Sequence, residues 1–505
     1  MWPVESRISG RSLGALLVVV LMVGTACAQS AQSDAGYKKH ARKVQPGTVQ
    51  TADLHKLFPL YFMENRAGVP DATPFVCLRH WASMFLTSNG PVVELLTTYD
   101  EVTMEPMLRV SFEGAGPSVP TAGDPVALFN YYRGRVSSGW YEEVPAYDTV
   151  FYKDVYAGID LAVKGNQPDC LYAFALGTGV STDNIKFRVD GSSAVLSIEP
   201  WGLRINGDFD EIDEYLPVAY QMTPSGRVDL ATAFKLFEPT LYGFDIAGID
   251  PSLPLYIEHE PALPGFLARG TFPWHCGYVA KGLDTDVVIA GTASGYDIPF
   301  IGDPYAPRWC PSQLGFFSAR LTSGGQLKWC TILDGLTEDE GWEADDYCAA
   351  VAIGCDRSVW LTGASQSNDF PMLDAFCDQH HGTNSGDVVV SRLNERGLLR
   401  FSSYLGGSSS EAAYDIDVDK HGDAWITGFS DSWDFPTPNS NAPHPPNRSR
   451  AVIVSKVTKQ GILAWGYCFG AGSFSSGQGI AVDRALNAWV TGSTRSAELP
   501  DAGRL

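Results

Sequence analysis

Apolar and polar residues alternate through much of residues 52–263, and this period of two predicts β-strands. Residues 186–190 and 203–205 are clear examples. The pair Asn206-Gly207 follows the second run and supplies the positive φ angles that a tight hairpin needs. No part of this region keeps a 3.6-residue apolar period for three turns. We therefore predict an all-β chain that begins with a β-sandwich-like domain.

A different pattern begins near residue 264, where the sequence repeats. A glycine is followed eight residues later by a proline four times: Gly291 with Pro299, Gly363 with Pro371, Gly428 with Pro436, and Gly492 with Pro500. An apolar strand pattern that contains tryptophan precedes each of the last three glycines. A second strand–glycine–strand pattern, which ends in an aromatic residue, recurs between the pairs. Each unit thus predicts two hairpins and four strands, the content of a β-propeller blade.

The units are longer than the commonest propeller repeats. The key glycines are 72, 65 and 64 residues apart, whereas a WD40 blade has roughly 40–45 residues. The extra residues lie between the proline and the next hairpin, as at residues 437–450, and predict a loop on one face. The glycine favours close backbone approach and the proline ends a strand, so we interpret the motif as a packing device.

These patterns predict the organisation of the whole chain. They divide it into a signal peptide at residues 1–28, a flexible lead-in at 29–51, the sandwich-like domain at 52–263 and the repeat domain at 264–505, with units at about 272–329, 330–401, 402–465 and 466–505. About 3.5 units are visible, and a closed propeller typically needs at least four blades. Three arrangements stay open: a truncated chain, a last blade completed by an N-terminal strand, or an array that does not close.

The N-terminal residues predict export. Two arginines precede an apolar stretch at residues 13–23, which is too short for a comfortable membrane span. Residues 26–28 read Ala-Cys-Ala and match a cleavage site. Lipidation at Cys27 is a second option, although Gly24 stands where a lipobox has leucine. We therefore place the protein outside the cell or in the periplasm, and we expect no transmembrane segment in the mature chain.

Charge and cysteine usage exclude two classes of site. The formal net charge is −22, and so acidic a surface repels phosphate backbones, which argues against a nucleic-acid partner. None of the ten cysteines forms a C-x-x-C pair, which argues against a zinc ribbon. The disulfide pairing and the oligomeric state stay open.

One acidic run has the oxygen ligands that calcium prefers, because it contains Asp415, Asp417 and Asp419. In the aligned units, however, Ala352 and Ala481 occupy the position of Asp417, and the spacing differs from that of an EF-hand loop. The run therefore fits the outward face of a strand better than a calcium loop, and we assign no metal site to it.

Other residue groups show no catalytic motif. The adjacent His380 and His381 lack the partner spacing of a zinc site. We interpret the acidic stretch 338–346 as a solvated loop, and the one G-x-S-x-G match lies at residues 10–14, within the signal peptide. Three aromatic residues near turns fit either a core or a ligand-stacking role: Trp140, Tyr141 and Trp433. We therefore predict no catalytic, cofactor-binding or metal-binding residues. A carboxylate pair for glycosidic chemistry stays open, because it needs no local motif.

The repeats resemble the SBBP repeats of secreted bacterial proteins, which form β-propeller-type blades. A typical blade reads approximately YLGG, IAVD, GNAYVTG and DFP in order. The matching segments are Tyr404-Leu-Gly-Gly407, Ile416-Asp-Val-Asp419, Gly422-Asp-Ala-Trp-Ile-Thr-Gly428 and Asp434-Phe-Pro436, then Ile480-Ala-Val-Asp483 and Asn487-Ala-Trp-Val-Thr-Gly492. The region before them resembles the domain that commonly precedes these repeats, through Phe62-Met-Glu-Asn-Arg66, Val155-Tyr-Ala-Gly-Ile-Asp-Leu161 and Pro217-Val-Ala-Tyr-Gln221. The resemblance covers residues 52–505 and implies an exported β-propeller protein without established catalytic residues.

Three functions are compatible with these features. The first is non-enzymatic binding of a protein or a polysaccharide, or a scaffold role, at the cell envelope or outside the cell. The second is a secreted polysaccharide hydrolase or lyase with carboxylates in a propeller-centre pocket. The third is a structural spacer. We adopt the first as the prediction, with no cofactor and with an unknown protein or polysaccharide as the partner.

Overall fold

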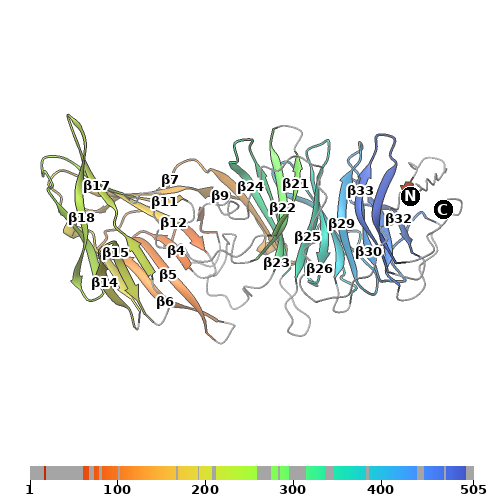
Figure 1. Cartoon of the computed structure of the whole chain (residues 1–505), viewed down its shortest axis with the longest axis horizontal. Coiled ribbons are helices and arrows are strands. Elements are labelled where there is room, and N and C mark those ends of the chain that lie inside the picture. Colours follow the sequence, from red (N-terminus) through yellow and green to blue (C-terminus); the bar gives the residue numbers. More distant parts are fainter. Residues whose placement is uncertain are drawn as a thin grey trace, which may run out of the picture.

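The protein is described by a computed structural model. The described residues are 16–18, 61–66, 73–78, 82–99, 103–166, 169–191, 193–207, 212–258, 275–281, 285–294, 314–335, 345–382, 386–440, 449–470 and 474–495. Strands dominate them, and the short helices among them are the single 3₁₀ turns Ser137–Gly139 and Thr182–Asn184. Blade-like sheets follow one another along the long axis of the molecule (Figure 1). The predicted all-β fold is confirmed.

Two layers of antiparallel strands form the sandwich-like region. One layer contains β7 (Thr121–Ala122), β10 (Thr149–Tyr156), β11 (Ile159–Asn166), β12 (Asp169–Leu176), β20 (Leu255–Glu258) and β17 (Val218–Thr223). The other contains β4 (Ala82–Thr87), β5 (Gly90–Tyr99), β6 (Thr103–Phe112), β13 (Phe187–Asp190), β19 (Leu241–Ala247) and β18 (Gly226–Glu238). The long strand β18 pairs with β17 at its start and with β19 at its end, so it joins the two layers.

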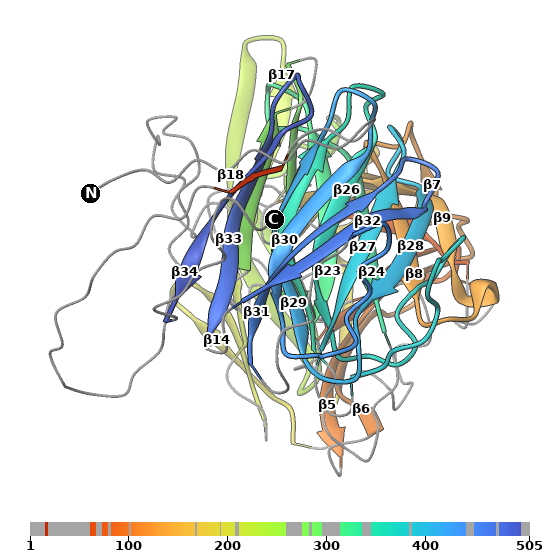
Figure 2. The ribbon, with the colours of Figure 1, turned by 90° about the vertical axis from the view of Figure 1, so that its right-hand side faces the viewer.

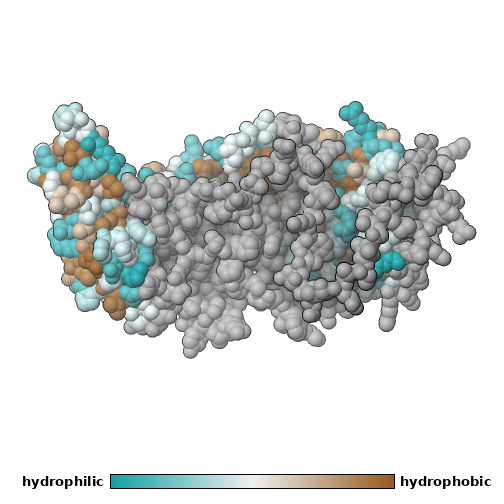
Figure 3. All heavy atoms as spheres, in the orientation of Figure 1, coloured by the Kyte–Doolittle hydropathy of each residue, from teal (hydrophilic) through white to brown (hydrophobic). Residues whose placement is uncertain are grey.

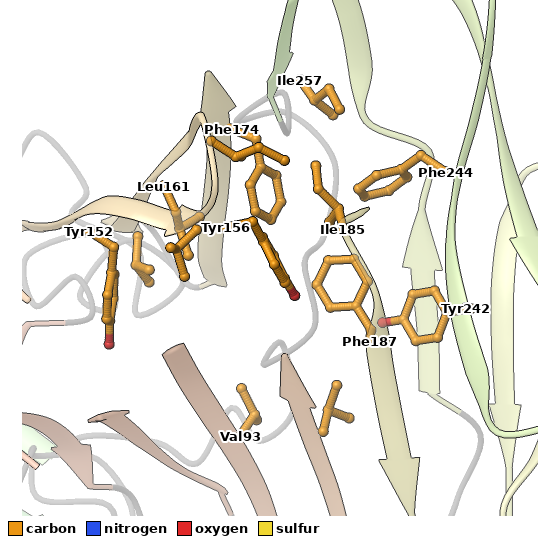
Figure 4. Close-up of a cluster of buried hydrophobic side chains, with 14 of the residues drawn as sticks. Val93, Tyr152, Tyr156, Leu161, Phe174, Ile185, Phe187, Tyr242, Phe244 and Ile257 are labelled. Carbon is orange, nitrogen blue, oxygen red and sulfur yellow. The ribbon is translucent and has the colours of Figure 1, made fainter. Parts of the chain in front are cut away.

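Aromatic side chains fill the space between these layers (Figure 4). Phe187 stacks on Tyr242 with ring centroids 4.9 Å apart, and Phe174 and Phe244 pack around them. Each such ring removes a large apolar area from water, which makes this cluster the main source of stability for the region. The small sheet of β14 (Val195–Glu199), β15 (Gly202–Asn206) and β16 (Ile212–Tyr215) closes one side of it.

The second half of the chain contains the predicted four-stranded units. The sheets are β21 (His275–Lys281), β22 (Val287–Ser294), β23 (Leu314–Leu321) and β24 (Leu327–Asp334); β25 (Asp346–Ile353), β26 (Val359–Ser365), β27 (Asp387–Leu393) and β28 (Leu399–Leu405); and β29 (Glu411–Val418), β30 (Ala424–Ser430), β31 (Ala451–Val457) and β32 (Leu463–Phe469). We call these sheets blades 1, 2 and 3. In the end-on view, the strands of successive blades lie behind one another (Figure 2).

The last blade contains β33 (Ser475–Val482) and β34 (Ala488–Thr494), with the short β1 (Leu16–Val18) parallel to β34. The sheets of the described blades are not closed, which does not conflict with an incomplete ring. The bounds predicted for the domains and repeat units stay predictions.

The sandwich-like region and blade 1 share one continuous sheet. Strand β24 pairs in parallel with β8 (Ala127–Arg133), which continues through β9 (Tyr141–Tyr147), β2 (Phe62–Glu64) and β3 (Phe75–Leu78) to β4. Leu128 lies opposite Trp329 at one end of the β8–β24 pairing, and Arg133 lies opposite Asp334 at the other. The two halves are therefore joined by main-chain hydrogen bonds as well as by side chains.

The key glycines of the repeat sit where two strands approach too closely for a side chain. Each faces a bulge in the first strand of its blade. A Cβ atom on Gly428 would lie 2.0 Å from the carbonyl oxygen of Ala412, and Gly363 and Gly492 face the same obstacle. This explains the glycine of the motif and confirms its role in close backbone approach.

The inserted loops cover the outer edges of their own blades. After the first proline, Leu373 bridges to Ser402 on β28. After the second, the carbonyl of Pro438 accepts a hydrogen bond of 3.1 Å from Gly466 N on β32. Because unpaired edges invite aggregation, these loops protect the strands that they cover.

Exposed apolar side chains gather at one end of the molecule (Figure 3). They belong to β14, β17 and β18 and include Val195, Ile198, Met222 and Val228. Within the described part of the chain, no helix is both long and apolar enough to cross a membrane.

Gly428→Ala should destabilise the protein strongly, because the new methyl group must displace the backbone of the neighbouring strand. We expect a loss of about 3 kcal/mol in the free energy of unfolding. Urea denaturation followed by tryptophan fluorescence measures it. Gly123→Ala is the matched control, since no atom lies within 4 Å of its Cβ position. Equal stability of both variants would contradict the close-approach explanation.

Candidate functional site

A cleft of about 720 Å³ opens where the sandwich-like region meets blade 1. It is lined by Tyr61, Pro125, Val126, Ala127, Leu128 and Asp148 from the first half of the chain, and by Thr322, Gly325, Gln326, Leu327 and Lys328 from blade 1. Clefts of this size between structural units are typical ligand sites. We therefore regard it as the candidate functional site.

Two elements fix the shape of this cleft. The turn between β23 and β24 is held by a hydrogen bond of 2.9 Å from Gly325 N to the carbonyl of Thr322. Gly325 adopts φ +80°, which favours glycine, and the Thr322 hydroxyl accepts a further bond from Gln326 N at 3.1 Å. On the other wall, Val126 N donates to the carbonyl of Ala146 at 2.8 Å. Both walls are thus preorganised by backbone hydrogen bonds.

A buried ion cluster supports the blade 1 wall. Asp286 accepts bonds from Lys328 Nζ at 2.8 Å and from Arg320 Nε at 2.9 Å. Lys328 and then Arg320 hold the pKa of Asp286 below its ordinary value, although burial opposes this. Lys328 is still half-exposed and is one of the residues that line the cleft.

Tyr61 and Asp148 supply the polar groups of the opposite wall. Burial raises the pKa of Tyr61 well above its ordinary value, and the nearby Cys330 and Asp148 add to the effect. The phenol therefore stays protonated at physiological pH and keeps a proton to donate. Its ring packs edge-on against Phe129 at 5.7 Å, whereas Asp148 is exposed at the rim.

This arrangement is suited to holding a polar ligand. Val126 and Leu128 are apolar, and the lining also includes residues that carry a hydroxyl, an amide, a carboxylate and an ammonium group. Such groups can bond the hydroxyls of a sugar or the backbone of a peptide. Among the described residues that line the cleft, Asp148 is the one carboxylate, whereas glycosidic hydrolysis normally uses two.

Carboxylates do come close together elsewhere, at the junctions between blades. At the first junction, Asp346 is fully buried and accepts bonds from Gly335 N at 2.9 Å and from Ser367 Oγ at 3.0 Å. Burial, and after it the charge of the neighbouring Asp334, raise the pKa of Asp346 to about 8. Asp334 in turn pairs with Arg133 of β8 at 3.0 Å.

A comparable pair of buried carboxyls lies at the second junction, between blades 2 and 3. Asp387 and Glu411 are both buried, and a Cβ atom on Gly406 would lie within 3 Å of each carboxylate. Glu411 accepts bonds from Ser430 Oγ at 2.6 Å and from Gly407 N at 2.9 Å. Burial raises the pKa of Asp387 to about 6. These four residues are buried at the blade junctions, and none of them is among the residues that line the cleft.

A buried carboxyl also lies in the sandwich core. Glu214 of β16 accepts hydrogen bonds from the hydroxyls of Tyr172, at 2.6 Å, and of Tyr242. Burial raises the pKa of Glu214 to about 7, although both bonds oppose this. The carboxyl thus satisfies two phenols that would otherwise be unpaired in an apolar core.

The carboxylates of the acidic run 415–419, which we considered as a calcium site, are bonded to groups of the protein itself. Asp419 accepts bonds from His421 N, Asp423 N and the indole of Trp425, and pairs with Lys456 at 3.1 Å. Asp415 and Asp417 accept backbone bonds from β33 of the last blade. Among the described residues, no group of three or more His, Cys, Asp or Glu side chains could hold a metal ion.

The histidine pair and the aromatic candidates are dispersed. His381 Nδ1 lies 3.7 Å from Cys377 Sγ, and the ring of His380 contacts Tyr404. Trp140 donates to the carbonyl of Gly134 and packs against a core tyrosine. Trp433 is 58% exposed. None of these residues lines the cleft.

The interpretation of the acidic stretch 338–346 needs a partial correction. Residues 336–344 lie outside the described residues, but Asp346 is fully buried at the first junction. The interpretation as a solvated loop is therefore wrong for Asp346. Sequence reasoning also missed every lining residue of the cleft, because no motif connects positions that lie about 200 residues apart.

Comparisons with known proteins add one domain assignment. A family model described as "Domain of unknown function (DUF7948)" matches residues 62–258, fewer than half of the chain. No curated protein matches the chain. Among solved structures, a gluconolactonase from Xanthomonas campestris aligns at 12% identity and a TM-score of 0.22, over 76% of this chain and 97% of that chain. So low a score carries no conclusion about activity, and the SBBP resemblance stays a prediction.

Stability should fall as the pH rises, because the buried junction carboxyls bind their protons more tightly in the folded state. For Asp346, the pKa rises from 3.8 to about 8 on folding. Its contribution is complete below pH 4 and is lost as the pH rises to 8. Asp346→Asn should therefore reduce the slope of the unfolding free energy by about 1.4 kcal/mol per pH unit between pH 5 and 7.

Urea titrations at pH 5, 6 and 7 measure this slope. Asp124→Asn, an exposed carboxylate, is the control and should leave the slope unchanged. An unchanged slope in Asp346→Asn would show that this residue is ionised in the folded protein at these pH values.

Proposed function

We propose that this chain is an exported, non-enzymatic binding protein that holds a polysaccharide of the cell envelope or its surroundings in the cleft between the sandwich-like region and blade 1. The observation that carries the proposal is the lining of the cleft. Polar and charged residues from two structural units line an open space together with apolar residues. This combination favours recognition of a molecule rich in hydroxyl groups.

The placement of the carboxylates supports binding over hydrolysis. A glycosidase needs an acid and a second carboxylate about 5–9.5 Å apart on either side of the bond that is cleaved. In the described residues, the close pairs Asp334–Asp346 and Asp387–Glu411 are buried within blade junctions. A sugar polymer cannot reach these pairs without separating the blades.

Export is part of the proposal and is supported by the sequence. The arginines and the apolar stretch at residues 13–23, followed by Ala-Cys-Ala, are typical of a signal peptide. The SBBP resemblance of the repeats fits the same location. The strongly acidic surface keeps such a protein soluble outside the cell and makes a neutral or basic ligand more favourable than an anionic one.

Val126→Arg should abolish binding, because Val126 is 42% exposed in the wall of the cleft and a larger charged side chain would fill it. Val195→Arg is the matched control: it makes the same substitution at an exposed position of β14, outside the cleft lining. Purified protein is immobilised and tested against a panel of neutral and acidic polysaccharides. We expect at least a tenfold loss of binding in Val126→Arg alone.

Three other outcomes would overturn the proposal. Shortening of a polymer by the wild-type chain would show a hydrolase or lyase. Capture of an envelope protein without any polysaccharide would assign the site to protein recognition. Binding that is equal in both variants would place the site elsewhere.

A further inference from the structure

A thiol and an imidazole lie close together on the loop that covers the outer edge of blade 2. Cys377 Sγ is 3.7 Å from His381 Nδ1. Cys377 is a free cysteine and is partly buried, whereas His381 is exposed. Neither residue lines the cleft between the sandwich-like region and blade 1. Because thiolate and imidazole are both metal ligands, this pair has the chemistry of a metal site that is separate from the cleft.

The fold of a blade does not require this pair. Cys377 and His381 follow the proline of their repeat unit by six and ten residues. At the same positions after Pro436, the next unit has Ala442 and Pro446, which carry no ligand atom in their side chains. Blade 3 nevertheless has the same four strands as blade 2. The need to build a blade therefore does not account for the thiol and the imidazole.

Hydrogen bonds to the sheet fix the backbone of both residues. Cys377 N donates to Ser403 Oγ at 3.0 Å, and the carbonyl of Cys377 accepts bonds of 3.1 Å from Tyr404 N and from Ser403 Oγ. His381 N donates to Asp387 Oδ2 at 2.8 Å. Ser403 lies on β28 and Asp387 on β27, and both are buried. The sheet thus places the two residues before any ion binds, which lowers the entropy cost of binding.

The separation of the two ligand atoms suits one metal ion between them. A first-row metal such as zinc contacts sulfur at about 2.3 Å and histidine nitrogen at about 2.0–2.1 Å. The sum of these distances exceeds 3.7 Å, so one such ion can contact Sγ and Nδ1 at the same time. Soft thiolate ligands select copper(I), and imidazole also suits copper. Copper(I) is stable with two ligands, which is the number that this pair offers.

The surroundings favour a cation that takes the place of the thiol proton. Burial raises the pKa of Cys377, although a backbone hydrogen bond with Gln379 opposes this, and the charges of Asp387 and Asp378 raise it further. The thiol is therefore protonated at neutral pH, and the same two negative charges attract a cation. When copper(I) binds, the S–H bond breaks, an S–Cu bond forms and the proton passes to solvent. The net charge of the site is unchanged.

We propose that Cys377 and His381 form a copper(I)-binding site at the outer edge of blade 2, with Cys377 Sγ as the thiolate ligand and His381 Nδ1 as the neutral imidazole ligand. This function goes beyond the ligand binding proposed for the cleft and does not depend on it.

Competition with bathocuproine disulfonate, a coloured copper(I) chelator, tests this site in the full, reduced chain without oxygen. Cys377→Ser and His381→Gln should each weaken copper(I) binding at least tenfold. Cys355→Ser and His421→Gln are the matched controls, because they change an exposed thiol and an exposed imidazole elsewhere in the blades. Both controls should bind copper(I) as tightly as the wild type does. Circular dichroism of all five proteins verifies that they are folded.

Thiol alkylation followed by mass spectrometry locates the ion. Copper(I) should slow alkylation of Cys377 at least tenfold in the wild type but not in His381→Gln, in which the thiol is intact. This measurement does not depend on the stability of Cys377→Ser.

Three outcomes would overturn the proposal. Unchanged copper(I) binding in His381→Gln would show that the imidazole is not a ligand. Loss of binding in Cys355→Ser would place the ion at another thiol. Equal protection of Cys377 by Zn²⁺ at the same concentration would show that the site does not select copper(I).

Discussion

The parallel pairing of β24 with β8 is the contact on which the arrangement of the molecule depends. It joins a sandwich-like region to an array of blades by main-chain hydrogen bonds, so the two halves cannot move independently without breaking a sheet. One end of this pairing forms the cleft. At the other end, Arg133 pairs with Asp334, which is one member of the first pair of buried carboxyls. The candidate site and the first blade junction are therefore two ends of the same structural element.

Beyond this pairing, successive blades pack against one another through the same kind of contact. The turn glycine of one blade lies against an aromatic ring in the last strand of the blade before it. A Cβ atom on Gly397 would lie 2.7 Å from the ring of Trp329, and Gly461 packs on Phe401 in the same way. Both glycines have positive φ angles near 80°. Each blade thus needs its neighbour for burial, as in other repeat proteins.

Local sequence was informative wherever the structure depends on local geometry. The eight-residue spacing from Gly428 to Pro436 identified the repeated sheets, because a bulge and a strand end impose those residue types wherever they recur. No local pattern indicates the β8–β24 pairing, which joins residues about 200 positions apart. Asp346 was misinterpreted for a related reason: its acidic neighbours suggest solvent, but its burial depends on Gly335 and Ser367 in other segments.

The same distinction explains why the cleft, and not the repeat, is the better candidate for function. Polar side chains of the repeat motif are committed to the backbone, as Asp434 is to Ser408 N at 2.9 Å. Their replacement would damage folding before it affected any ligand. In the cleft, the exposed Gln326 and Asp148 lie on walls that backbone hydrogen bonds already fix. Such positions are free to vary with the ligand, which is the usual property of a binding site built on a rigid scaffold.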